Sequence, residues 1–240
     1  MKYIVFALLI VFAAGCTKTK SVPDIVTGLT VNIGFDSLSL DSPSNTYGSV
    51  YKGIPASNHH GNNDKAMQFS RTDSAYVDFG ALSGASFNKV FTICCWVEVS
   101  DTSDAIAILS KRGISGPFEY SLDNHFDHNI LNLDNWVSNG ATSVYGIDPL
   151  KASAQIQPNV WQHIAYVADG TMLKVYINGV LQGNTDQYND GLALSATNAS
   201  LVIANGGAWG KNYFFDGKID NVRMYNRALP AAAISYLAGL

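Results

Sequence analysis

Short apolar segments alternate with clusters of turn-forming residues along the sequence, and this pattern limits the chain to an all-β fold. The apolar segments are rich in β-branched and aromatic residues, and Gly, Asn, Asp and Pro separate them. We expect strands at residues 29–35, 66–70, 75–80, 91–99, 105–111, 118–122, 130–136, 160–169, 173–179, 200–206 and 214–226. So many short strands predict a two-sheet antiparallel sandwich.

Two dipeptides mark tight turns within this pattern. Asp169-Gly170 and Asn178-Gly179 both lie between apolar runs and favour the positive φ angles of hairpin turns, so three consecutive antiparallel strands are expected there. Only the tail, "PAAAISYLAGL", favours a helix. Pro230 suits its first position, and Ile234 and Leu237 share one face.

Residues 1–15 have the pattern of a signal peptide. The apolar run "YIVFALLIVFAA" follows Lys2 and is too short for a stop-transfer helix. The next residues, "AAGC", resemble a bacterial lipobox, with Ala13 where a large aliphatic residue is usual. The resemblance implies lipidation of Cys16, which anchors the chain to a membrane; an ordinary secretory signal with a free cysteine is the alternative. Residues 16–28 are polar and aperiodic, as in a tether.

Charge and cysteine content exclude some classes of protein. Without Lys2 the chain has 14 basic and 19 acidic residues, a net charge of −5, and no basic stripe of the kind that binds nucleic acid. Composition indicates a single domain, residues 29–240. Cys94 and Cys95 are adjacent on an expected strand, so their side chains point to opposite faces. Two buried thiols are favoured over a strained vicinal disulfide.

Four segments carry a resemblance to a known family. They are "AMQFSRTDSAYVDFG", "FTICCWVEV", "VWQHIAYVADGTMLKVYINGVLQG" and "FDGKIDNVRMYNRALPAAAI". Their order and spacing resemble the laminin-G-like, concanavalin A-like jelly-roll domains of bacterial surface proteins. The resemblance implies two antiparallel sheets packed face to face, with a short C-terminal helix.

Catalysis has little support in the sequence. Glycosidases use a pair of carboxylates, and glucanases of this fold carry Glu-x-Asp-x-x-Glu on one strand. The chain has two glutamates, Glu98 and Glu119, and neither has that neighbourhood. The remaining carboxylate pairs lie in turn-like sequence and are Asp123 with Asp127 and Asp186 with Asp190.

Histidines are the second kind of residue that could support catalysis or bind a metal. His125 and His128, in "DNHFDHN", could supply a lyase base or hold a transition metal, but they match no known ligand set. His163 lies on an expected strand, where the family has Trp-x-His as part of its scaffold. We therefore interpret His163 as structural, and enzymatic activity remains the less favoured option.

Sugar binding requires exposed aromatic rings with polar neighbours. Trp96 and Trp161 match the family core. The ligand candidates lie instead in turn-like sequence and are Trp136, Trp209, Tyr145, Tyr188 and Tyr213, with His125 and His128 nearby. Each aromatic could alternatively fold down onto the sandwich.

Asp220 is a charged residue within the last expected strand. Alternation places it with Val222 and Met224 on the core side, and Arg223 on the other face. A carboxylate there must be paired, hydrogen-bonded or metal-bound. The family resemblance implies a structural calcium held by Asp220, together with Asp41 and Asn45 of the loop "DSPSNTYGS". A carboxylate satisfied by backbone N–H groups is the alternative.

These observations predict a lipid-anchored envelope protein that binds a glycan or another surface ligand without chemistry. Thr17, in place of an inner-membrane retention aspartate, favours the outer membrane by analogy. The alternatives are a polysaccharide hydrolase or lyase, and an adhesive module with a protein partner.

Overall fold

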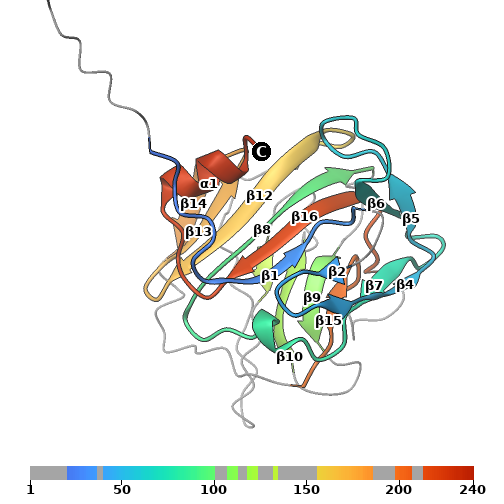
Figure 1. The fold of residues 1–240 in the computed structure, drawn as a ribbon, viewed down its shortest axis with the longest axis horizontal. Coiled ribbons are helices and arrows are strands. Elements are labelled where there is room, and N and C mark those ends of the chain that lie inside the picture. The colour runs from blue at the N-terminus through green and yellow to red at the C-terminus, as the bar shows by residue number, and fades with distance from the viewer. Residues whose placement is uncertain are drawn as a thin grey trace, which may run out of the picture.

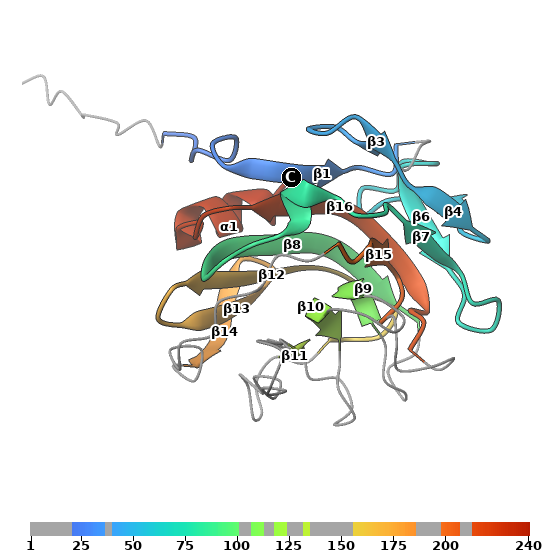
Figure 2. The ribbon, with the colours of Figure 1, turned by 90° about the horizontal axis from the view of Figure 1, so that it is seen from below.

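Two antiparallel sheets pack face to face in the computed structural model of the chain (Figures 1 and 2). The structure describes residues 21–36, 40–100, 107–112, 118–123, 132–134, 156–185, 198–206 and 213–240. We call the larger sheet A and the smaller sheet B. The predicted jelly-roll sandwich is confirmed.

Sheet A contains ten of the described strands, in the order β14-β13-β12-β8-β16-β1-β2-β3, with β6 also paired to β16 and β5 to β6. Their bounds are β1 Leu29–Ile33, β2 Leu40–Asp41, β3 Thr46–Tyr47, β5 Ile54–Ala56, β6 Ala66–Phe69, β8 Val90–Val99, β12 Trp161–Asp169, β13 Leu173–Ile177, β14 Val180–Thr185 and β16 Gly217–Tyr225.

Sheet B contains six of the described strands, in the order β11-β10-β9-β15-β7-β4. Their bounds are β4 Ser49–Tyr51, β7 Tyr76–Asp78, β9 Ala107–Arg112, β10 Phe118–Asp123, β11 Asn132–Asp134 and β15 Leu201–Ile203. A 3-10 turn, η1 (Ser83–Ala85), and the helix α1 (Ala231–Leu237) complete the described elements.

The main core lies between the sheets. Alternate residues of each strand point inward, as the two-residue period of a strand requires. Cys95 and Val97 of β8 face Leu109 of β9, Leu122 of β10 and Ile203 of β15 in one buried cluster. Burial of this cluster between the sheets holds the sandwich together.

All eleven predicted strands are present, although their ends differ by a few residues. The structure adds β2, β3, β4 and β5 between residues 40 and 56, where the sequence pattern predicted no strands. Each has only two or three residues, and three residues are too few for alternation to be recognised.

The predicted hairpin turns are both present. Asn178 and Gly179 have φ angles of 50° and 77° and connect β13 to β14, as predicted. The turn from β12 to β13 is wider: Asp169 N donates to Met172 O, and Asp169 Oδ1 accepts from the backbone N of Thr171 and Met172.

Strand β16 lies inside sheet A between β8 and β1 and carries a β-bulge at Asn221. Asp220 pairs with Trp96 and Arg223 with Cys94, so β16 has one residue more than β8 over this step. Asn221, with φ 51°, takes up the extra residue. The prediction that Asp220 shares the core face of Val222 and Met224 is therefore wrong, because the bulge shifts the alternation and puts Asp220 on the outer face with Trp96 and Arg223.

Helix α1 covers the outer face of sheet A beside β12 and β13 (Figure 1). Ile234 and Leu237 of the helix are buried in a second cluster with Cys94, Ala165 and Tyr225 of the sheet. Pro230 is the N-cap residue, one position before its predicted place, and no side chain caps the helix.

Cys94 and Cys95 are free, buried and on opposite faces of β8, as predicted. In the part of the chain that the structure describes, no helix is long and apolar enough to cross a bilayer.

Candidate ligand-binding face

Two parts of the outer face of sheet A are covered by the chain itself. α1 covers one end, and the loop after β5 covers the other by placing His59 over Trp96, with ring centroids 3.9 Å apart and planes 9° apart. The ring of Trp96 is therefore buried and is not available to a ligand.

The outer face of sheet B carries an aromatic row at its β4 edge. Val77 of β7 points into the core, so its neighbour Tyr76 points outward. Tyr51 of β4 pairs with Tyr76 and stacks on it, with centroids 4.4 Å apart and planes 14° apart. The ring of Phe214 also lies near Tyr76, with centroids 6.2 Å apart and planes 40° apart. We call Tyr51, Tyr76 and Phe214 the aromatic row.

Exposure differs along the row. Tyr51 is 48% exposed, while Tyr76 and Phe214 are half-buried. Burial raises the pKa of the Tyr76 hydroxyl, and Tyr51 and Asp78 add to the shift. Tyr51 therefore presents one free ring face, supported from behind by Tyr76.

Polar side chains share this face of sheet B. Ser49 pairs with Asp78 two residues along from Tyr51 and Tyr76, so these side chains lie beside the row. Asp78 Oδ1 accepts from Gly80 N at 2.7 Å, which orients the carboxylate beside the row. Val202 of β15 pairs with Asp78 on one side and with Ser110 of β9 on the other, and both Val202 and Ser110 are buried, so the exposed polar groups end at Asp78. Hydroxyl and carboxylate groups next to a flat ring are the groups that a sugar requires.

Most of the ligand residues predicted from sequence fall outside the described residues; these are Trp136, Trp209, Tyr145, Tyr188, His125 and His128. Cys16 also lies outside them. Tyr213 is described: it is half-buried, its carbonyl accepts from Gly206 N, and it directly precedes Phe214. The sequence analysis missed the row itself, because Tyr51, Tyr76 and Phe214 come from three separate segments.

Both glutamates form ion pairs with lysine side chains. Glu98 Oε1 lies 2.7 Å from Lys218 Nζ, and Glu119 Oε1 lies 3.1 Å from Lys111 Nζ. The second pair is buried, with the side chains of Lys111 and Glu119 at 1% and 0% exposure. Neither glutamate is placed as a free acid or base on an open surface.

Of the predicted calcium ligands, Asp41 accepts hydrogen bonds that stabilise the β2–β3 hairpin and its contact with β1. Its Oδ1 accepts from Asn32 N at 2.8 Å, and its Oδ2 accepts from the backbone N and the hydroxyl of Ser44. Asn45 is exposed, with a φ of 56° that suits a turn residue. Calcium binding at Asp220 stays a prediction. Asp41 and Asn45, the further ligands that the sequence indicated, are not in contact with Asp220 among the described residues.

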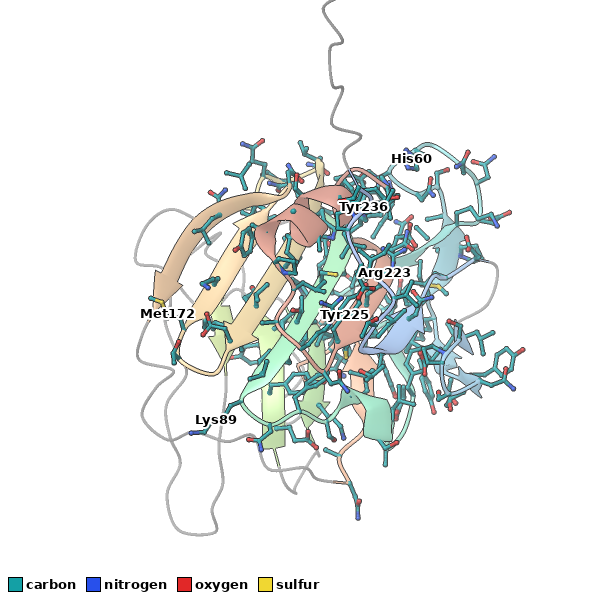
Figure 3. The ribbon with its side chains drawn as sticks, turned by 60° about the vertical axis from the view of Figure 1, so that its left-hand side comes forward. His60, Lys89, Met172, Arg223, Tyr225 and Tyr236 are labelled. Atoms are coloured by element: carbon teal, nitrogen blue, oxygen red, sulfur yellow. The ribbon has the colours of Figure 1, made fainter. Side chains whose placement is uncertain are left out.

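Asp220 is 1% exposed, and the hydrogen bonds to its carboxylate among the described residues come from one residue, Asn221. Asn221 N donates to Oδ1 at 2.7 Å, and Asn221 Nδ2 donates to Oδ2 at 2.9 Å. Burial, helped by the charge of Asp36, raises the pKa of Asp220 to about 7, although the hydrogen bonds from Asn221 and the charge of Arg223 act to lower it. The side chain of Arg223, labelled in Figure 3, donates to Asn221 Oδ1, and among the described residues no ion pair joins Arg223 to Asp220.

His163 lies beside Trp96 on the same face, with ring centroids 5.5 Å apart. Burial lowers the pKa of His163 to about 3, and the charges of Arg223 and His59 contribute. A base that stays neutral and is 1% exposed fits the structural role expected from sequence.

Comparison with known proteins places this geometry in context. A laminin G profile described as Concanavalin A-like lectin/glucanases superfamily matches residues 71–235. A comparison with curated proteins finds no match.

Three solved structures illustrate the shared fold. Domain 4 of AbnA, a GH43 extracellular arabinanase from Geobacillus stearothermophilus, in complex with arabinotriose, has 21% identity and a TM-score of 0.67, with 88% of this chain and 98% of that chain covered. The binding domain of Paraclostridial Mosquitocidal Protein 1 has 18% identity and a TM-score of 0.65, with 88% and 52% covered.

A Trypanosoma rangeli sialidase has 17% identity and a TM-score of 0.57, with 88% and 32% covered. The chain thus spans about half of the second structure and a third of the third. These likenesses show the fold alone. Because the profile match spans more than half of the chain, the protein belongs to the Concanavalin A-like lectin/glucanases superfamily.

Proposed function

We propose that this protein binds carbohydrate without altering it, on the outer face of sheet B. The observation that carries the proposal is the stacked pair of Tyr51 and Tyr76, with one exposed ring face beside the polar side chains of Ser49 and Asp78. A sugar ring presents its C–H face to such a ring and its hydroxyls to the polar groups. The AbnA domain crystallised with arabinotriose supports a glycan as the class of ligand.

The pairing of both glutamates favours binding over hydrolysis. A glycosidase needs one carboxyl group as acid and a second as base or nucleophile, both facing the substrate. Glu98 and Glu119 are each held by a lysine, and Glu119 is buried. The hydrolase or lyase alternative would use Asp or His residues of the region 123–136, most of which lies outside the described residues.

The binding test starts with a glycan array probed with the full-length protein, followed by calorimetric titration of the best ligand. We expect Tyr51→Ala to weaken binding about ten-fold, which corresponds to about 1.4 kcal/mol. Tyr47→Ala is the matched control, because Tyr47 is 58% exposed and stands outside the row. Equal affinity of the wild type and Tyr51→Ala would contradict the proposed face.

A reducing-sugar assay on the same glycans separates the remaining classes. Release of sugar would establish an enzyme. Binding without release supports the proposal. If the protein neither binds the glycans nor releases sugar from them, the remaining function is that of an adhesive module with a protein partner.

We also propose that lipid on Cys16 anchors the domain to the cell envelope, at the outer membrane. The lipobox-like "AAGC" and the polar tether of residues 16–28 support this location. Metabolic labelling with a clickable fatty acid should mark the wild type and leave Cys16→Ser unlabelled. Labelling of the variant would disprove the anchor.

The predicted calcium is tested by a calorimetric melt with and without chelator. A structural ion should lower the melting midpoint on removal, because it binds only the folded state. An unchanged midpoint at confirmed metal depletion would exclude it.

A further inference from the structure

The chain enters the folded domain through a segment that is fixed against the end of β16. Arg227, just after β16, donates to Thr27 O at 2.6 Å and to Asp24 O at 2.7 Å, and its guanidinium lies 3.4 Å from the Asp24 carboxylate. Tyr225 Oη donates to Ile25 O at 3.1 Å. The fold therefore sets the place at which the residues before Asp24 leave the domain. We call residues 21–28 the entry segment.

The entry segment lies beside helix α1. Ile25 packs against the cluster that α1 forms with the outer face of sheet A. Gly179, in the turn between β13 and β14, also meets the helix, because a Cβ atom on it would lie 2.8 Å from Ser235 Cα. Figures 1 and 2 both show the entry segment, α1 and β14 at one end of the sandwich and β4 at the other.

The surface at this end is apolar. Val22 and Val26 of the entry segment are 69% and 74% exposed. Leu181 of β14 is 46% exposed, and it pairs with Tyr176 of the α1 cluster, so it lies on the helix side of sheet A. Residues 230–240 include no charged side chain, and alanine and serine fill the exposed positions of α1. We call Val22, Val26, Leu181 and the exposed side of α1 the entry face.

The connection to Cys16 is short compared with the domain. Asp24 is eight residues after Cys16, which allows a separation of at most about 29 Å in an extended chain and roughly 16 Å on average in a flexible one. A domain of this length has a diameter of about 43 Å. A lipid on Cys16 therefore keeps the entry face near the bilayer, at an effective concentration at which weak contacts become populated.

We propose that the entry face rests on the surface of the lipid bilayer, with Val22, Val26 and Leu181 at the boundary between headgroups and acyl chains. This inference rests on the lipid anchor proposed above. Burial of apolar area favours such binding, and the uncharged side of α1 has no ionised group to dehydrate. In this orientation β4, with Tyr51 of the aromatic row, lies at the end far from the bilayer, where a glycan can reach it.

The test uses residues 16–240, which include every described residue, with Cys16 coupled to a maleimide phospholipid in phosphatidylcholine vesicles. Cys94 and Cys95 are buried and do not compete for the maleimide. Amide hydrogen exchange is measured with and without coupling. We expect exchange in residues 21–28, 180–182 and 231–240 to slow about three-fold or more on the vesicles, while residues 46–54 exchange at the same rate.

Two double variants locate the contact. Val26→Glu/Leu181→Glu places two charges on the entry face and should abolish the slowing. Tyr47→Glu/Ile54→Glu is the matched control, because these two side chains are also exposed, at 58% and 56%, but lie outside the entry face. The control should keep the slowing, and thermal melts check that both variants are folded.

Three results would overturn the proposal: equal exchange of the entry face with and without vesicles, slowing that survives Val26→Glu/Leu181→Glu, and slowing that disappears as the protein-to-lipid ratio is lowered. The last would assign the face to contact between copies of this chain.

Fatty-acid labelling of Cys16 tests the anchor separately from the entry face. Labelling in cells without slowing on vesicles refutes the entry face alone. Slowing of the coupled protein without labelling in cells refutes the natural anchor alone.

Discussion

Lys111 and Glu119 form an ion pair that is sealed from solvent, with Nζ 3.1 Å from Oε1 at one end of the core. Lys111 Nζ also donates to Ala199 O at 2.8 Å, and Ser86 Oγ donates to Glu119 Oε1 at 3.1 Å. These contacts join β9 and β10 to the segments around Ser86 and Ala199. The pair is part of the framework of sheet B.

Removing one charge of this pair should be costly. We expect Glu119→Gln to lower the free energy of unfolding by about 3–5 kcal/mol, because it leaves the Lys111 ammonium buried without its counter-charge. Urea unfolding measures the change. Lys174→Gln breaks the half-exposed pair with Asp169 and should cost no more than about 1 kcal/mol. Equal losses in the two variants would show that burial does not govern the effect.

The bulge in β16 depends on the left-handed backbone of Asn221. Asn221→Ala and Asn221→Gly both remove the side-chain bonds to Asp220 and Arg223, but only glycine adopts a φ of 51° without strain. The alanine variant should therefore be about 1–2 kcal/mol less stable than the glycine variant. Equilibrium denaturation of the two proteins compares them directly. A difference near zero would mean that the bulge is not strained.

Acid should destabilise the protein through His163. The folded state holds the pKa of His163 at about 3, below the usual 6.5, so the unfolded chain takes up a proton first as the pH falls. Stability from the neutral ring is complete above pH 6.5 and is lost on the way down towards pH 3. Between pH 7 and pH 5 this residue should account for a loss of about 2 kcal/mol.

The measurement is urea unfolding at both pH values, in chelator, for the wild type and His163→Phe. The variant should lose less stability, although His59, whose pKa burial also lowers, keeps some acid sensitivity. Identical pH dependence in the two proteins would contradict the assignment to His163.

The thiols of Cys94 and Cys95 should be inert in the native state. Burial raises the pKa of Cys94 to about 12 and also raises that of Cys95, so neither forms the reactive thiolate at neutral pH. A thiol reagent should label them only after unfolding, with Cys16 of non-lipidated protein as the reactive reference. Rapid labelling of folded Cys16→Ser protein would refute this.

The strands and their turns could be predicted because alternation is a local property. Residues 91–99 and 160–169 each contain enough positions to show the two-residue period. The face of Asp220 could not be predicted, since one extra residue at Asn221 reverses the alternation without any mark in the apolar pattern. Asn at the bulge is a weak hint, because asparagine tolerates positive φ better than most residues.

The aromatic row and the contact of His59 with Asp220 both depend on segments that are distant in the sequence. Tyr51, Tyr76 and Phe214 meet only through the register of β4 with β7 and the approach of the chain after residue 213. His59 reaches Asp220 across 161 residues, through a loop whose polar sequence carries no strand or helix period. Sequence patterns describe the elements, whereas these sites arise from tertiary pairing.

The position of β16 constrains the order in which the molecule can be assembled. β1, near the start of the folded domain, pairs with β16, and β16 also separates β8 from β1 and β6. Until Tyr225 has been synthesised, the first strand has no partner on that side, and the described strands of sheet A form three separate groups: β14-β13-β12-β8, β1-β2-β3 and β5-β6. Contacts of such long sequence separation slow folding. During synthesis, the nascent chain should therefore remain open and accessible to chaperones until its last strand is available.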